Sequence, residues 1–156
     1  SSAASDVYKR QRLSSESKLK IRAMLREVTE IESIGDSCYN LARTINHKYR
    51  GNEDFTEKQY SHIHQMFQLT DDALNQMVSL VEDEGHQVDV NKSFNLENEI
   101  NNYRSQLKNQ NVLDVNNKEY DYQMGVHYMD LIGECEKLGD YIVNVVEART
   151  DMKEKK

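Results

Sequence analysis

The sequence contains no proline and no tryptophan, and only six of its 156 residues are glycine. Because proline and glycine are the residues least compatible with a helix interior, their scarcity favours helix throughout the chain. Cysteine occurs only at Cys38 and Cys135, and we expect two reduced thiols in the core rather than a disulfide. No apolar run approaches the roughly 20 residues that a membrane-spanning helix needs. We therefore expect residues 1–156 to form a soluble segment.

An excess of positive charge is also lacking, since the formal net charge is −7. Nucleic acids are bound by clustered lysine and arginine, so the balance of charge argues against a nucleic-acid partner and against general adsorption to anionic lipid. The length suffices for one compact domain with a sizeable core.

The first eleven residues, SSAASDVYKRQ, resemble the in-frame translation of a transposase-based sequencing adapter. We exclude residues 1–11 from the domain as a processing scar and expect them to contribute nothing to the fold. On this interpretation the natural chain is cut off before Arg12. The domain then spans residues 12–149, and residues 150–156 form a charged, frayed tail.

An internal repeat organises the rest of the chain. The segment EIESIGDSCYNLAR at residues 30–43 returns as ECEKLGDYIVNVVE at residues 134–147. The alignment superposes Glu30 on Glu134, Glu32 on Glu136, Gly35 on Gly139, Asp36 on Asp140 and Asn40 on Asn144. An internal repeat has to be recognised before the fold is assigned, because overlooking it leads to the wrong fold.

Each copy contains the pattern E-x-x-x-D-x-x-x-N, which places two carboxylates and an amide along one face of a helix. Like charges at this spacing repel, so the stripe indicates a cation or a basic partner; the competing interpretation is bonding to basic or amide side chains across the bundle. Gly35 and Gly139 lie in apolar seams, where we expect both glycines to be buried at close helix crossings. The seam of the first copy is Ile21, Met24, Val28, Ile31, Gly35, Cys38, Ala42 and Ile45, and that of the second is Tyr128, Ile132, Cys135, Gly139, Ile142 and Val146.

The two segments IESIGDSCYNLA and CEKLGDYIVNVV resemble the doubled signature of PhoU-like domains, which regulate phosphate uptake. The resemblance extends over most of residues 12–149. More narrowly, NLENEINNYRSQL and DVNNKEYDYQMGVHYMDLIGECEKLGDY are similar to the cytoplasmic tail of bacterial sodium/phosphate cotransporters.

The resemblance implies a metal site, because PhoU-like domains bind multinuclear metal clusters through paired E-x-x-x-D motifs. The ligands it implies are Glu32, Asp36, Glu136 and Asp140, with Glu97 as a third ligand across the bundle from the second motif. The metal would be Fe, Zn²⁺, Mg²⁺ or Mn²⁺. The sequence departs from the family at Asn101 and Asn102, where the opposing motif would carry a carboxylate, and amide oxygens hold transition metals poorly.

Apolar periodicity predicts an all-α bundle of four long antiparallel helices. Their expected spans are residues 15–50, 56–84, 93–108 and 119–147, with Ser15 and Ser93 as N-caps. Residues 109–117 are expected to form a loop, with continued helix through part of them as the alternative. The predicted seams of the second and third helices are Ile63, Phe67, Thr70, Leu74, Met77 and Val81, and Leu96, Ile100, Tyr103 and Leu107. PhoU-like domains have two three-helix repeats. On that template the first helix ends a preceding repeat, and the other three helices form one complete repeat.

No catalytic motif is present, and we expect no enzymatic activity. A di-iron oxidase would need Glu-x-x-His on two helices, and the nearest candidate is the single run at residues 83–86. His127 is the only histidine near a repeat motif, and we expect it to serve packing or the surface.

We therefore expect a regulatory cytoplasmic domain of a sodium-dependent phosphate transporter. The parent protein would lie at the cytoplasmic face of the bacterial inner membrane. The partner would be a membrane transporter domain upstream of residue 12 in the same chain, or other phosphate-transport proteins, and a homodimer is possible. The alternative is a freestanding PhoU-type metal-binding regulator of phosphate signalling.

Overall fold

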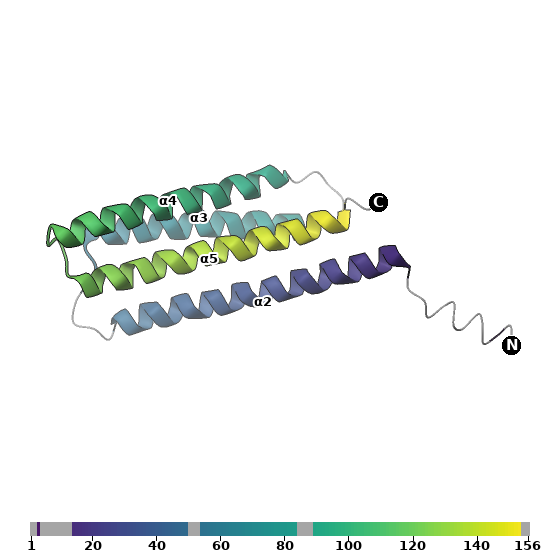
Figure 1. Cartoon of the computed structure of the whole chain (residues 1–156), viewed down its shortest axis with the longest axis horizontal. Helices are drawn as coiled ribbons and strands as arrows, with labels where there is room; N and C mark the ends of the chain where they lie inside the picture. Colours follow the sequence, from purple (N-terminus) through teal and green to yellow (C-terminus); the bar gives the residue numbers. More distant parts are fainter. Residues whose placement is uncertain (1–2, 4–13, 50–53, 84–88, 154–156) are drawn as a thin grey trace.

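A computed structural model describes residues 3, 14–49, 54–83 and 89–153. Four long helices occur in it, α2 (Ser15–Tyr49), α3 (Glu57–Glu82), α4 (Val90–Asn116) and α5 (Tyr122–Lys153), and no strand occurs among the described residues. Helices α2 and α4 run antiparallel to α3 and α5 (Figure 1). The predicted all-α fold of four long helices is confirmed.

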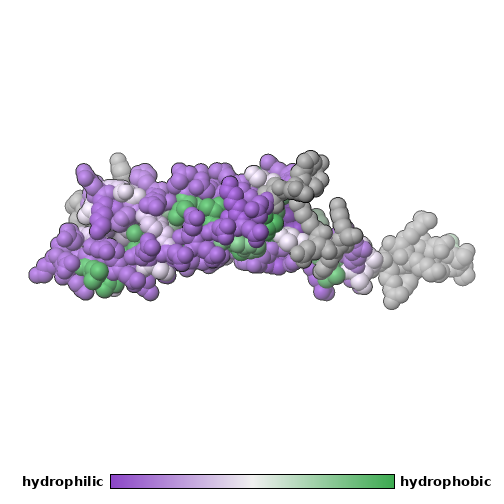
Figure 2. Space-filling view, turned by 90° about the horizontal axis from the view of Figure 1, so that it is seen from above, coloured by the Kyte–Doolittle hydropathy of each residue, from purple (hydrophilic) through white to green (hydrophobic). Residues whose placement is uncertain are grey.

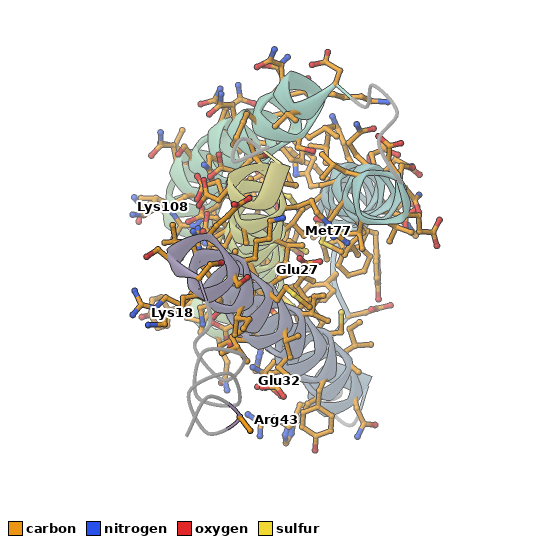
Figure 3. The ribbon with its side chains drawn as sticks, turned by 90° about the vertical axis from the view of Figure 1, so that its right-hand side faces the viewer. Lys18, Glu27, Glu32, Arg43, Met77 and Lys108 are labelled. Atoms are coloured by element: carbon orange, nitrogen blue, oxygen red, sulfur yellow. The ribbon has the colours of Figure 1, made fainter. Side chains whose placement is uncertain are left out.

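Helix α5 is the centre of the molecule, because α2, α3 and α4 all pack on it while the backbone of α2 does not come close to α3 or α4. Viewed along the bundle, α3 and α4 lie on one side of α5, and α2 lies on the other side (Figure 3). The predicted seam of α5 is confirmed, since all six of its residues are buried. The seam residues of α3 and α4 are likewise buried or half-buried. Three helices thus enclose the core, and α2 is added to it along one edge.

The predicted seam of α2 is wrong, because every one of its eight residues is exposed. Val28 is 56% exposed and Ile31 44% exposed, whereas Glu27, Ile34 and Ser37 are the buried positions of this helix. The reason is that α2 has only one neighbour. Its more polar face lies on α5. No described helix packs on its more apolar face, although Cys38, Ala42 and Ile45 line an open groove between α2 and α3. The opposite face of the molecule, on the α4 side, is mostly hydrophilic with small separate hydrophobic areas (Figure 2).

The two glycines of the repeat therefore have different surroundings. At Gly139 an added Cβ would meet the Ile100 side chain at 3.4 Å, as expected for a close helix crossing. At Gly35 an added Cβ would have nothing within 4 Å. The prediction of burial is confirmed for Gly139 and wrong for Gly35.

The helix boundaries and capping residues in the structure correct several of the predicted ones. Ser14, not Ser15, accepts the amide of Ser17 at the start of α2. Asp89 caps α4, so that Ser93 lies buried inside the helix. Residues 109–116 continue α4, so the helical alternative holds there and not the loop. Helix α5 extends to Lys153, so residues 150–153 of the predicted frayed tail are helical, and the rest of that tail lies outside the described residues. Thr56 is the N-cap of α3, with a reciprocal Gln59 bond, next to the predicted start of this helix. The adapter interpretation falls almost entirely outside the described residues.

The two cysteines are free, but only Cys135 lies in the predicted core, since Cys38 is exposed. Burial raises the pKa of the Cys135 thiol to about 12. Because the thiolate is the reactive form, we expect Ellman's reagent to label one thiol per chain under native conditions and two in denaturant. Cys38→Ser should abolish the native labelling. Rapid native labelling of both thiols would contradict the packing around Cys135.

Candidate functional site

The contact between α2 and α5 joins the two copies of the repeat and is largely polar. Asn144 donates to Glu30 Oε2 at 3.1 Å, which links the asparagine of the second copy to the first glutamate of the first copy. Because the helices are antiparallel, the symmetry-related pair is Asn40 and Glu134. Glu134 instead accepts from Ser37 at 2.9 Å and from Lys137 at 3.3 Å, while Asn40 lies beside it along one groove. The crossing thus forms one of the two pairs that a twofold arrangement of the repeat would give.

An ion pair anchors the other end of the same crossing. Arg149 Nη2 on α5 lies 3.4 Å from Glu27 Oε1 on α2 and donates to the Val81 carbonyl of α3 at 2.9 Å. The Glu27 side chain is only 10% exposed. Arg149 therefore connects three helices.

The carboxylates of the second motif face α4. Arg104 Nε lies 2.9 Å from Glu136 Oε2, and Asn101 donates to Glu97 Oε1 at 3.2 Å. Burial raises the pKa of Asp140, and a hydrogen bond with Glu97 opposes that shift. The predicted approach of Glu97 to the second motif is therefore present at Asp140, whereas the partner of Glu136 is an arginine.

The carboxylates of the first motif lie elsewhere. Glu32 and Asp36 are exposed on α2, and Figure 3 shows Glu32 pointing away from the bundle. Gly35 and Gly139 do not bring the two motifs together, because the Gly35 face of α2 is uncovered.

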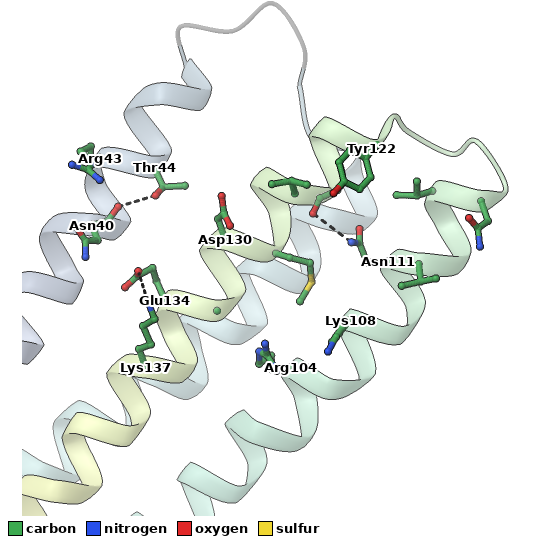
Figure 4. A pocket seen from close by; sticks show the side chains of 17 residues that line it. Asn40, Arg43, Thr44, Arg104, Lys108, Asn111, Tyr122, Asp130, Glu134 and Lys137 are labelled. Carbon is green, nitrogen blue, oxygen red and sulfur yellow. Dashed lines mark hydrogen bonds and ion pairs between the residues drawn. The ribbon is translucent and has the colours of Figure 1, made fainter.

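A groove lies between α2 and α4, with α5 as its floor (Figure 4). Its volume is about 790 Å³. Four cations line it: Arg43 on α2, Arg104 and Lys108 on α4, and Lys137 on α5. The carboxylates on its lining are Asp130 and Glu134. No sequence-based prediction included these cations. The i, i+4 spacing of Arg104 and Lys108 was the available signal, but the facing Arg43 depends on the packing of α2.

Comparison with known protein families decides the family. The PhoU domain model matches residues 63–148, which is more than half of the chain. The chain belongs to the PhoU family. No curated protein and no solved structure gave a match.

The match extends from the first turns of α3 through α4 and most of α5, so it covers the three helices that enclose the core. Helix α2 lies outside the match but carries the other copy of the repeat. Membership of the PhoU family indicates a phosphate-related regulatory role. Families of this kind act by regulation rather than catalysis. No described helix combines the length and hydrophobicity needed to cross a bilayer.

The metal chemistry of the PhoU family does not fit the carboxylates as they are placed here. In the described part of the chain, no three His, Cys, Asp or Glu side chains are grouped to hold a metal ion. Glu32 and Asp36 are on a separate face from Glu136 and Asp140, and Arg104 neutralises Glu136. A bound metal therefore remains only a prediction from the family resemblance, and the described residues do not provide a group of ligands for it.

Melting experiments on Asp140→Asn test this interpretation. In chelator we expect the substitution to raise the Tm by about 1 °C, because it removes a carboxylate next to Glu97 and leaves an amide that donates to it. We expect Mg²⁺, Mn²⁺, Zn²⁺ or Fe²⁺ to leave the Tm of the unsubstituted chain within error. A metal-induced rise in Tm that Asp140→Asn abolishes would instead support the predicted site.

Proposed function

We propose that this PhoU domain is the regulatory cytoplasmic domain of a sodium-dependent phosphate transporter and controls phosphate uptake. The family match over residues 63–148 is the observation that carries the proposal, because it supplies the phosphate-related regulatory role. The similarity of residues 95–107 and 114–141 to cotransporter tails supports a transporter as the protein that is regulated. These two segments are neighbours in space, since they form the packed parts of α4 and α5.

The architecture suits regulation by contact rather than catalysis. Helix α2 is held to the rest of the domain through α5 alone, and the polar side chains at this crossing come from both copies of the repeat. Rearranging a polar contact of this kind costs less free energy than rearranging a packed core, because its polar groups can form hydrogen bonds with water instead. A signal that alters the α2–α5 crossing would therefore be passed to a transporter domain joined to α2.

The alternative is a freestanding PhoU-type regulator that acts on separate phosphate-transport or signalling proteins. Sequencing the gene upstream of the Arg12 codon separates the two proposals. Several apolar segments of about 20 residues would support the transporter domain. Two amphipathic helices preceded by a start codon would support the freestanding regulator and overturn the transporter proposal.

A further inference from the structure

The groove between α2 and α4 has the size and the shape of a small-molecule site. Pockets that hold such ligands typically enclose about 300–1,000 Å³, and the groove encloses about 790 Å³. Gly133 forms part of its floor, and an added Cβ there would have nothing within 4 Å. The hollow therefore depends on a missing side chain.

The groove is the place where this acidic chain presents positive charge from opposite sides. Arg43 on α2 and Lys108 on α4 belong to its lining on opposite sides of α5, and neither has an ion-pair partner among the described residues. Arg104 and Lys137 add two further cations, each next to a carboxylate. With the net charge of the chain at −7, unpaired cations on facing helices favour an anionic ligand at this position.

The remainder of the lining is apolar and aromatic. Val112, Val115, Val126 and Met129 line the groove, and Tyr122 lies toward the loop between α4 and α5 (Figure 4). Tyr122 is 75% exposed, so its ring is available for stacking. A purely inorganic anion would leave these surfaces unused.

We propose that the groove binds a nucleotide, with its phosphates between Arg43 and Lys108 and its base on the apolar side next to Tyr122. The inference rests on the proposed regulatory function, which it deepens by naming the signal as an organic phosphate. Because α2 and α4 do not touch, a ligand held by both would join them across α5. Binding would thereby fix α2 relative to the core.

Titration calorimetry on the whole chain in chelator tests the inference, with ATP, AMP, adenosine and inorganic phosphate as probes. We expect ATP to bind and to raise the Tm, and inorganic phosphate and adenosine each to bind at least about tenfold more weakly. No ATP binding at millimolar concentration would overturn the inference, and so would equal affinity for inorganic phosphate. Neither result would affect the proposed regulatory function, which phosphate uptake tests separately.

Substitutions along the groove locate the site. Arg43→Glu and Lys108→Glu should each weaken ATP binding at least about tenfold, because each removes a charge-assisted hydrogen bond and adds repulsion. Asp130→Asn should strengthen binding, since it removes a negative charge from the lining. Gly133→Leu should block binding without loss of Tm, because it enters open space.

Lys92→Glu is the matched control, since Lys92 is an exposed lysine of α4 outside the groove. It should leave the affinity for ATP unchanged. An equal loss of affinity in Lys92→Glu and Lys108→Glu would show non-specific attraction and overturn the site.

Discussion

Gly139→Leu is expected to lower the free energy of unfolding by the usual cost of overpacking, about 1–3 kcal/mol, whereas Gly35→Leu should not lower it. The two glycines occupy the same position of the repeat, but only Gly139 faces a neighbouring helix, with Ile100 at 3.4 Å from an added Cβ. A leucine there must displace Ile100 or separate α4 from α5. At Gly35 the new side chain enters open space. Replacing a glycine inside a helix should then raise the free energy of unfolding by up to about 1 kcal/mol.

Thermal unfolding at low protein concentration measures both effects. For a chain of this size each kcal/mol corresponds to about 2–4 °C, so the two variants should differ in Tm by several degrees in opposite directions. Equal destabilisation by both substitutions would show that Gly35 also lies at a packed crossing. An unchanged Tm for Gly139→Leu would contradict the close approach of α4 and α5.

Arg149→Met is expected to cost about 2 kcal/mol, because it leaves the buried Glu27 carboxylate without its partner. This loss of stability is smaller than that expected for a fully buried ion pair, since the Arg149 side chain is 28% exposed. Arg26→Met is the matched control at the same α2–α5 contact. Its ion pairs with Glu147 and Asp151 are exposed, so we expect its effect to stay within about 0.5 kcal/mol.

Urea unfolding of the double variant Glu27→Leu/Arg149→Met provides the second test of this ion pair. Removing both charges should recover much of the lost free energy, because no buried carboxylate then remains unpaired. A double variant as unstable as Arg149→Met alone would instead assign the loss to the Val81 carbonyl or to packing of the arginine stem.

The sequence allowed the fold to be predicted where one helix had neighbours on several sides. Apolar periodicity identified the buried face of α5 at all six seam positions, because α3 and α4 cover it while α2 touches its other side. The same reasoning failed for α2. Periodicity shows which face of a helix is apolar, but whether another helix covers that face depends on the tertiary arrangement.

The candidate site was predictable only in part for a similar reason. The repeat identified Glu30, Asn144 and the α5 carboxylates as positions of interest, and Glu30 and Asn144 do pair. The repeat could not show that Arg104 would form an ion pair with Glu136, or that Glu32 and Asp36 would be exposed. The groove was missed because its cations come from three helices and become neighbours only when those helices pack.

Phosphate uptake is the most direct measurement of the central claim that this PhoU domain regulates a phosphate transporter. Sodium-dependent uptake of radioactive phosphate should be compared in cells that express the parent gene with and without the codons for residues 12–156, after growth in high and in low phosphate. If the domain regulates the transporter, growth in high phosphate lowers uptake only when the domain is present. Uptake that responds equally to phosphate in both strains, or that does not depend on the parent gene, would contradict the claim.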